Sequence, residues 1–476
     1  MRQYKELVIS DPERLLYGTC PHPVRCGFDL EIGGGLVFPE VNFTLPPMEI
    51  CAATWKEVVA QYEEIATGVL RRAVALRAPG IVLEFELLPA MTETPVWGAE
   101  ITALLHRRLA EAHERHGLKS ALRVTPTDIR DQARPPVLRE GGPWEKLKKS
   151  FALCIEAGAD IVSIESVGGK ELHDTGLMYA DMEAIAFALG ALAPRDMAWL
   201  WDRITALCEA GGHAIPAGDT ACGFANTAMQ LAHQKMLPEV LVAVVRAMSA
   251  ARSLAAFEHG AVGPSKDCAY EGPVLKAITG CPISMEGKSA SCAHFSPLGN
   301  VAASVCDLWS NESVQNIRLL SGNAPEAYTE LLVYDCRLMN VAASQGRAHM
   351  LRDWLAASDE ELSPQAALLT PAATVRIADA VVRAGTPYQR TVAAGVAAVS
   401  ELRERMAAGS LTLGRKEQQW LDRIDSQLSA LPPDEDDLRQ AVLTRYEGRF
   451  APASYGWSES LAFAEPVGTR PAGSSA

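Results

Sequence analysis

Strand-like apolar runs and helical patterns alternate along most of this chain. Thr54 and Glu57 match a capping box ahead of a helix predicted over 55–76, and the run IVLEFELL predicts a strand over 81–88. Further strands are predicted over 121–126, 159–166, 213–219, 254–262, 281–286 and 316–320, and further helices over 98–115, 144–157, 178–210 and 226–252. Such alternation is typical of parallel βαβ units. The predicted fold is therefore α/β, a (β/α)8 TIM-type barrel, with a doubly wound open sheet as the alternative.

The eighth strand of that barrel has no obvious place in the pattern. It lies either in the N-terminal arm or near 331–335, where the 3.6-residue period of LVYDCRLMNVAA favours a helix instead. Residues 1–53 are predicted to form an arm with a hairpin, in which DLEI and LVFPEVNF flank the glycine run from Gly33 to Gly35.

Beyond about residue 345 the chain becomes Ala-rich and helical. Helices are predicted there over 363–384, 386–408, 414–430 and 435–446. The predicted division is an N-terminal arm and hairpin (1–53), a barrel catalytic domain (54–345), a C-terminal helical extension (346–465) and a disordered tail (466–476).

The chain carries a strong acidic balance. Its 476 residues have a formal net charge of −14, which argues against nucleic acid or an anionic membrane as a partner. The N-terminus lacks the long apolar stretch of a signal peptide, and the most apolar window is interrupted by Arg246 and Arg252. We therefore expect a cytoplasmic protein.

Three short motifs each place one metal-competent side chain in a loop directly after a predicted strand. They are Glu165 in IVSIESVGGKE, Cys222 in AGDTACGFANT and Cys268 in GPSKDCAYEGP. The spacings, 57 residues from Glu165 to Cys222 and 46 from Cys222 to Cys268, leave room for a helix between successive ligands. Loops that follow parallel strands meet at one end of a barrel, so we predict that the three side chains converge.

The ligand types favour a catalytic zinc ion. Two thiolates and one carboxylate suit Zn²⁺, and three protein ligands leave a fourth coordination position open to substrate. By spacing alone, however, buried structural thiols explain the two cysteines better than a metal site does.

Acids near these loops are candidate catalytic groups. Glu84 and Glu86 alternate on the strand IVLEFELL and therefore point to one face, where a carboxylate is costly to bury without a task. Asp219 and Asp267 adjoin the ligand motifs and are candidates for tuning or protonating a leaving oxygen, although Asp219 also fits an ordinary turn before a helix. Glu286 lies at a strand end as well, where a salt bridge to a nearby lysine explains it equally.

Longer strings around these motifs resemble one known family. They are FDLEIGGGLVFPEVNFTLP (28–46), SIESVGGKE (163–171), AGDTACGFANTAM (217–229), GPSKDCAYEGP (263–273), ISMEGKSASCAHFSPLGN (283–300) and LVYDCRLMN (332–340). Together they resemble the zinc-dependent methanol:corrinoid methyltransferases. The resemblance implies that the zinc ligands are the Glu of the IES motif and the cysteines of GDTACGF and KDCAYEGP, which are Glu165, Cys222 and Cys268 here.

The same resemblance implies a reaction and a partner. The methyl group of methanol would pass to the Co(I) corrinoid of a partner corrinoid protein, giving methyl-Co(III), with zinc activating the methanol oxygen as the leaving group. This chain lacks a DxHxxG corrinoid-binding signature, so the corrinoid is expected to arrive with that partner, in a homo-oligomer or a hetero-oligomer. The alternatives are another methyl ether or alcohol as donor, a zinc-dependent hydrolase, which two thiolates disfavour, and a non-enzymatic scaffold.

Overall fold

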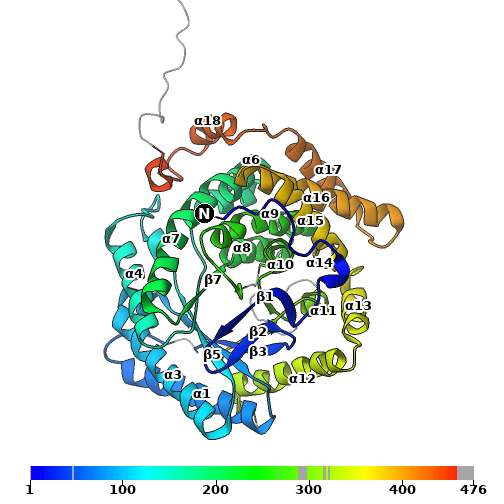
Figure 1. The fold of residues 1–476 in the computed structure, drawn as a ribbon. Helices are drawn as coiled ribbons and strands as arrows, with labels where there is room; N and C mark the ends of the chain where they lie inside the picture. Colours follow the sequence, from blue (N-terminus) through cyan, green and yellow to red (C-terminus); the bar gives the residue numbers. More distant parts are fainter. Residues whose placement is uncertain are drawn as a thin grey trace, which may run out of the picture.

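The computed structural model describes residues 2–45, 48–266, 269–287, 297–314, 318–319 and 322–457. A ring of helices surrounds a curled sheet, and further helices near the C-terminus lie outside that ring (Figure 1).

Seven parallel strands form the sheet, in the hydrogen-bonded order β7-β6-β5-β4-β3-β9-β8. They are β3 (Phe38–Thr44), β4 (Ile81–Leu87), β5 (Ser120–Pro126), β6 (Ile161–Ile164), β7 (Ile215–Asp219), β8 (Ser284–Glu286) and β9 (Leu308–Val314). Every neighbouring pair is parallel. Helices connect most successive strands, as parallel pairing requires.

A short segment, 262–265, joins the two edge strands and closes the sheet into a barrel. The backbone N–H of Val262 donates to the carbonyl of Pro216 on β7 (2.8 Å), and the N–H of Ser284 on β8 donates to the carbonyl of Ser265 (2.9 Å). Ser265 also forms a parallel bridge with Ile283. This segment occupies the position of an eighth strand between β7 and β8. The predicted (β/α)8 barrel is therefore confirmed.

Two of the predicted strands are wrong, and the two open positions for the eighth strand are resolved by the structure. The strand expected over 254–262 is instead the last turns of α9 (Glu239–Glu258) and the loop after it. The strand expected over 316–320 is also wrong: residues 318–319 form β10 (Arg318–Leu319), which pairs in antiparallel fashion with β11 (Gly322–Asn323) outside the barrel, and the barrel strand is β9, earlier in the chain. The N-terminal arm supplies β3 as the missing strand. Residues 331–335 lie in helix α12 (Ala324–Ser344), as the period predicted.

The N-terminal hairpin is formed by different strands from those predicted. Strand β1 (Thr19–Cys26) pairs with β2 (Leu30–Gly34) in antiparallel fashion, so DLEI does not pair with LVFPEVNF, most of which is barrel strand. The turn lies at residues 27–29, where Gly27 (φ 55°) and Asp29 (φ 56°) adopt the left-handed backbone that a tight hairpin needs.

This hairpin plugs the amino end of the barrel. Its side chains Cys26, Leu30 and Ile32 form one apolar cluster with the first inward residues of the strands, Phe38, Val82, Ala121, Ile161, Ala217 and Leu308. In Figure 1, β1 and β2 lie across the middle of the helical ring. Because the plug closes one end, the polar interior opens only at the carboxyl ends of the strands.

The helices around the barrel follow the predicted pattern with two corrections. They are α1 (Trp55–Ala75), α2 (Pro89–Glu93), α3 (Pro95–His116), α4 (Gly141–Glu156), α5 (Lys170–Tyr179), α6 (Met182–Phe187), a π turn (Ala188–Leu192), α7 (Ala193–Gly211), α8 (Cys222–His233), α9, α10 (Gly272–Thr279), α11 (Gly299–Ala303) and α12. The single helix predicted over 226–252 is two helices, α8 and α9, with Pro238 as the N-cap of α9. The predicted capping box is wrong: the Thr54 hydroxyl donates backward to the Glu49 carbonyl (2.6 Å) instead of capping α1.

The C-terminal helices are α13 (Ala348–Asp359), α14 (Pro364–Leu369), α15 (Pro371–Arg383), α16 (Pro387–Ala408), α17 (Arg415–Ser429) and α18 (Glu435–Arg445). The last three match the predicted helices closely. The single helix predicted over 363–384 is instead α14 and α15, divided where Pro371 begins a new helix, and α13 was not predicted. Three of them, α14, α16 and α17, pack on α9. Within the described chain, α9 alone is long and apolar enough to cross a membrane by length and composition, and 94% of its apolar window is buried inside the molecule.

Candidate active site

Inward side chains above the apolar plug form a polar layer inside the barrel. Arg123 donates from Nε to Glu40 Oε1 (2.5 Å) and from Nη1 to Ser163 Oγ (2.8 Å), and Ser284 donates to the other Glu40 oxygen. All four residues are at most 2% exposed. Burial raises the pKa of Glu40, and the Arg123 guanidinium opposes that shift. The floor of the site is therefore a fixed, hydrogen-bonded ion pair.

Three carboxylates meet one ammonium group above this floor. The Lys266 Nζ lies 2.8 Å from Glu165 Oε1 and 3.5 Å from Glu84 Oε1, and it forms a third ion pair with Glu86. Glu84 also accepts a hydrogen bond from Thr125 Oγ1 (3.1 Å). The predicted common face of Glu84 and Glu86 is confirmed, since both reach the same lysine. The sequence analysis considered a lysine here only as a salt-bridge partner of Glu286.

Strands β6 and β7 bring Glu165 and Cys222 to the same end of the barrel. Ile164 and Asp219 are paired across the carboxyl ends of these two strands. Glu165 follows Ile164 directly, and Cys222 is the third residue after Asp219. Two of the predicted ligands therefore follow neighbouring strands at the open end of the barrel.

Cys222 occupies a position that stabilises a thiolate. It is the first residue of α8, where the helix dipole and free backbone N–H groups favour negative charge. The Asn226 amide, one turn later, donates to Cys222 Sγ at 3.2 Å. The side chain is only 4% exposed. In its reduced and ionised form, a buried Cys222 with these donors would have the chemistry of a zinc ligand.

Asp219 is buried and belongs to a hydrogen-bonded group with Arg252, Ser166 and Trp201, which we call the Asp219 clamp. Its Oδ1 accepts hydrogen bonds from Arg252 Nη2 (3.0 Å) and from the Ser166 N–H (3.2 Å), and its Oδ2 accepts one from Trp201 Nε1 (3.1 Å). Arg252 donates in addition to the Ser166 carbonyl (2.9 Å). Because Ser166 follows Glu165, the clamp fixes the backbone that carries the Glu165 side chain.

A second hydrogen-bonded group, the Glu271 clamp, fixes the backbone next to Cys222. Glu271 Oε1 accepts hydrogen bonds from the Ala221 N–H (2.7 Å) and from Ser253 Oγ (2.7 Å). Burial raises the pKa of Glu271. Sequence reasoning missed both Glu271 and Arg252 as site residues. A signal for Arg252 was present, because a charge inside an otherwise apolar helix requires a buried partner.

Two predicted site residues, one catalytic candidate and one zinc ligand, cannot be placed. Asp267 and Cys268 lie outside the described residues, just after Lys266. Across the part of the chain that is described, no group of three or more His, Cys, Asp or Glu side chains is arranged to hold a metal ion. The three-ligand site thus stays a prediction, with two of its members placed.

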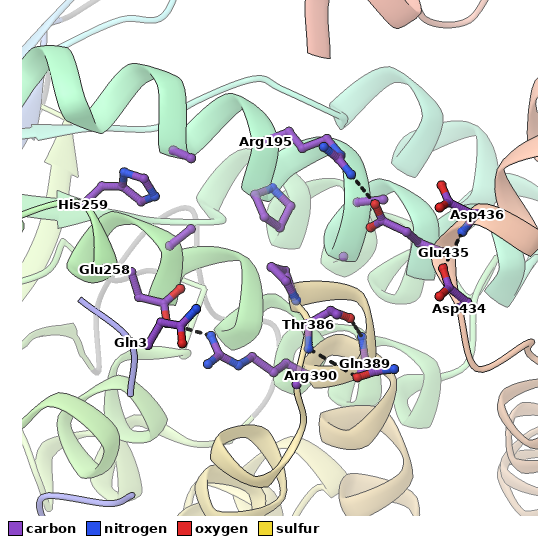
Figure 2. Close-up of a pocket in the computed structure, with 17 residues that line it drawn as sticks. Gln3, Arg195, Glu258, His259, Thr386, Gln389, Arg390, Asp434, Glu435 and Asp436 are labelled. Carbon is purple, nitrogen blue, oxygen red and sulfur yellow. Dashed lines mark hydrogen bonds and ion pairs between the residues drawn. The ribbon is translucent and has the colours of Figure 1, made fainter. Parts of the chain in front are cut away.

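A second hollow, of about 470 Å³, lies between α7, the end of α9 and the first turns of α16 and α18 (Figure 2). Its charges are matched within the chain: Arg390 Nη1 lies 2.8 Å from Glu258 Oε1, and Arg195 pairs with Glu435. The last turn of α9 leads into the closing segment at the amino end of the barrel. This groove is therefore separate from the candidate active site.

Comparison with known proteins identifies the family. Residues 1–456 match the family described as methanol-cobalamin methyltransferase B subunit. This chain belongs to that family. The resemblance seen in the sequence is thereby confirmed.

Two similar proteins come from Methanosarcina barkeri. The chain is 37% identical over 463 residues to a methanol–corrinoid protein co-methyltransferase, covering 96% of this chain and 99% of that protein. It also superimposes on a chain in the crystal structure of the methanol:cobalamin methyltransferase complex MtaBC with a TM-score of 0.92, at 37% identity, covering 96% of this chain and 100% of that one. Neither comparison addresses the metal.

Proposed function

We propose that this chain transfers the methyl group of methanol to the reduced corrinoid of a separate corrinoid protein. Family membership and the activity named for the 37% identical relative support the reaction. The structural observation that carries it is the pair of clamped loops that bring Glu165 and Cys222 to the open end of the barrel, where barrel enzymes hold their active sites.

In this proposal Glu165, Cys222 and Cys268 hold one zinc ion. When bound, zinc would supply Lewis acidity that makes the alcohol oxygen a better leaving group. The chain contributes the geometry: the Asp219 and Arg252 clamp fixes the Glu165 loop, and the Glu271 and Ser253 clamp fixes the loop before Cys222. Partners of this kind, which orient metal ligands, typically change affinity by about 10–100-fold when removed.

The carboxylates around Lys266 are proposed to handle the proton of the alcohol. Lys266 holds Glu165 and Glu84 through contacts of 2.8 and 3.5 Å. A carboxylate beside the bound alcohol favours the protonated alcohol over the alkoxide. Glu84 is the candidate acceptor of a hydrogen bond from the methanol hydroxyl, and Asp267 is proposed as a second catalytic acid. Asp219, with both oxygens occupied, is proposed as a positioning residue.

Apolar side chains around the open end support docking of a protein partner there. Val96 (56% exposed) lies in the first turn of α3 and Val137 (39%) in the loop between β5 and α4. Met178 (72%) and Tyr179 (68%) end α5, which lies between β6 and the longer helix α7, and Met236 (64%) lies between the shorter α8 and the longer α9, so all five lie between a strand end and the long helix that leads to the next strand or in that helix's first turn. Such segments surround the carboxyl end of a barrel. Exposed apolar groups gathered around a site are typical of protein–protein contact, and a corrinoid protein that delivers cobalt must cover this end.

The reaction is tested with methanol and free cob(I)alamin, by following the absorbance of methylcobalamin. Other methyl ethers and alcohols run in parallel test the donor. Glu165→Gln is expected to lose most zinc and most activity with an unchanged circular dichroism spectrum, because one ligand charge is removed from a folded site. Unchanged zinc content and activity in Glu165→Gln would remove this residue from the ligand set.

Docking is tested separately with the double variant Met178→Asp, Tyr179→Asp. It is expected to weaken binding of the cognate corrinoid protein while leaving zinc content and the reaction with free cobalamin intact. Leu362→Asp, on a residue 61% exposed outside these segments, is the matched control and is expected to bind normally.

A further inference from the structure

The last described residues of the chain lie against the loop 165–169, which carries Glu165. After α18 the chain forms a short 3-10 helix, η4 (Pro452–Tyr455), which packs on α7 (Figure 1). The Tyr455 side chain is only 3% exposed, and its Oη accepts a hydrogen bond from the Gly169 N–H at 3.0 Å. A contact across 286 positions therefore joins the C-terminal extension to a loop of the candidate active site.

Three backbone N–H groups of this loop have acceptors in different parts of the molecule. The Ser166 N–H donates to Asp219 Oδ1 on β7 (3.2 Å), and the Val167 N–H donates to Asp128 Oδ2 in the loop after β5 (3.0 Å). Both of these acceptors belong to the barrel. The third N–H, that of Gly169, is held by the tyrosine from outside the barrel. The loop is thus fixed partly by a segment that the barrel itself does not supply.

The two glycines of the loop are closely packed. A Cβ on Gly168 would lie 2.4 Å from the Asp196 Cβ, and one on Gly169 would lie 2.8 Å from the Ala188 carbonyl oxygen in the π turn. Gly169 also has φ +83°, a backbone conformation that favours glycine. Because Gly169 is buried, its N–H needs an acceptor within the protein, and the Tyr455 hydroxyl is that acceptor.

Tyr455 is anchored by residues on both sides of it in the chain. Ser454 Oγ donates to the Pro136 carbonyl at 2.9 Å. The Trp457 ring stacks on Phe187, with centroids 5.9 Å apart. Burial raises the pKa of Tyr455, so its hydroxyl stays neutral. A neutral hydroxyl held in one place is suited to fix the position of a single N–H group.

We propose that Tyr455 is a positioning residue for the zinc site, which fixes the loop of Glu165 by accepting the Gly169 N–H. This inference rests on the proposed function. Without the hydroxyl, a buried N–H would lose its acceptor, and the loop would shift to relieve that cost. A purely structural role would lower the stability of the chain without changing how it binds zinc.

Hydrogen–deuterium exchange of the full, metal-free chain tests the contact directly. Tyr455→Phe keeps the ring and removes the acceptor, so the peptide covering 165–169 is expected to exchange roughly 10-fold faster, as the loss of one local hydrogen bond predicts. Tyr446→Phe is the matched control, because its hydroxyl donates instead to Asp181 Oδ2 (2.6 Å), outside this loop. It is expected to leave the exchange of 165–169 unchanged. Equal exchange in the wild type and Tyr455→Phe would overturn the proposal.

Zinc affinity tests the consequence for the site. Titration against a competing chelator is expected to show about 10-fold weaker zinc binding in Tyr455→Phe and normal binding in Tyr446→Phe. The rate with methanol and free cob(I)alamin is expected to fall by a similar factor in Tyr455→Phe alone. Faster exchange with unchanged zinc affinity and rate would leave Tyr455 a purely structural residue and overturn the proposal.

Failure of the proposed function would be recognised separately. A wild-type chain that neither binds zinc nor methylates cobalamin would overturn both proposals, whereas an active wild type with an equally active Tyr455→Phe would overturn this one alone. Circular dichroism checks folding. If Tyr455→Phe does not fold, Ser454→Ala, which removes the anchor to Pro136, takes its place. It is expected to change exchange and zinc affinity in the same direction by a smaller factor, and no change in either would overturn the proposal.

Discussion

The guanidinium of Arg252 is fully buried in α9, and Asp219 supplies its counter-charge. From the sequence, Arg252 was noted only as a charge that interrupts an apolar run, and Asp219 as a candidate catalytic acid. In the structure they act together on the backbone beside Glu165. Their proposed effect on the site is therefore indirect, through the position of a ligand.

Replacing Asp219 with Asn tests that role. The change leaves a buried guanidinium without its counter-charge, so we expect a loss of about 3–5 kcal/mol in the free energy of unfolding. We also expect zinc to bind about 10–100-fold more weakly. Urea unfolding and zinc titration measure the two effects. Asp202→Asn, on a side chain 62% exposed, is the control and is expected to change stability by less than about 0.5 kcal/mol.

His173 gives the molecule a dependence on pH. Its ring is completely buried and packs edge-on against Phe224, with centroids 5.0 Å apart. Burial lowers the pKa of His173 below its usual 6.5, although Asp174 opposes the shift. Because the folded pKa is depressed, this histidine contributes stability that is present above pH 6.5 and is lost as the pH falls through the folded value.

The variant His173→Phe should reduce this acid sensitivity. We expect the difference in free energy of unfolding between pH 7.5 and pH 5 to shrink by about 1.4 kcal/mol for each unit by which the pKa is depressed. Urea titrations at the two pH values measure it. An identical pH dependence in both proteins would show that the folded ring accepts a proton without penalty.

At the scale of elements, the hairpin β1–β2 was mispredicted because glycines alone do not mark a turn. The run from Gly33 to Gly35 attracted the prediction, but the chain turns at Gly27 and Asp29. What selects this turn is contact with the barrel: the Phe28 N–H donates to the Ser120 carbonyl at 2.7 Å. That contact joins residues far apart in the chain and leaves no local signal.

Gly27→Ala is therefore expected to destabilise the protein. A Cβ at this position would lie 2.3 Å from the Ser120 carbonyl oxygen, and the backbone there has φ +55°. We expect a loss of at least about 1–3 kcal/mol in the free energy of unfolding, measured by urea denaturation. Gly142→Ala, where a Cβ would meet nothing within 4 Å, is the matched control and is expected to be neutral or slightly stabilising.

At the scale of the whole molecule, the barrel has a core that does not depend on a metal. Apolar side chains fill the space between strands and helices, and a separate cluster plugs the amino end. Glu165 and Cys222, two of the proposed ligands, lie at the opposite, open end. Metal binding is therefore expected to complete the site rather than the fold.

Removal of zinc by a chelator tests this separation. We expect activity to disappear while the far-ultraviolet circular dichroism spectrum is unchanged, with a thermal midpoint lowered only by the lost binding energy. The variant Cys222→Ser should behave like the chelated wild type. Cooperative unfolding on chelation would instead indicate a structural metal.

The local pattern of the sequence determined most of the elements. Helices α16, α17 and α18 were predicted within a few residues, since amphipathic periodicity is a local signal. The alternation of strands and helices was enough to predict the barrel, and six strings between residues 28 and 340 were enough to predict the family.

Only the tertiary structure decided how the barrel closes and what surrounds the site. The closing segment 262–265 has no strand pattern of its own, and α9 hides its boundary because it is apolar on all sides. The contacts of Glu84, Glu86 and Glu165 with Lys266, and the hydrogen bonds of Arg252 and Glu271, join residues up to 182 positions apart. Such contacts arise from the closure of the sheet in space, which no stretch of neighbouring residues encodes.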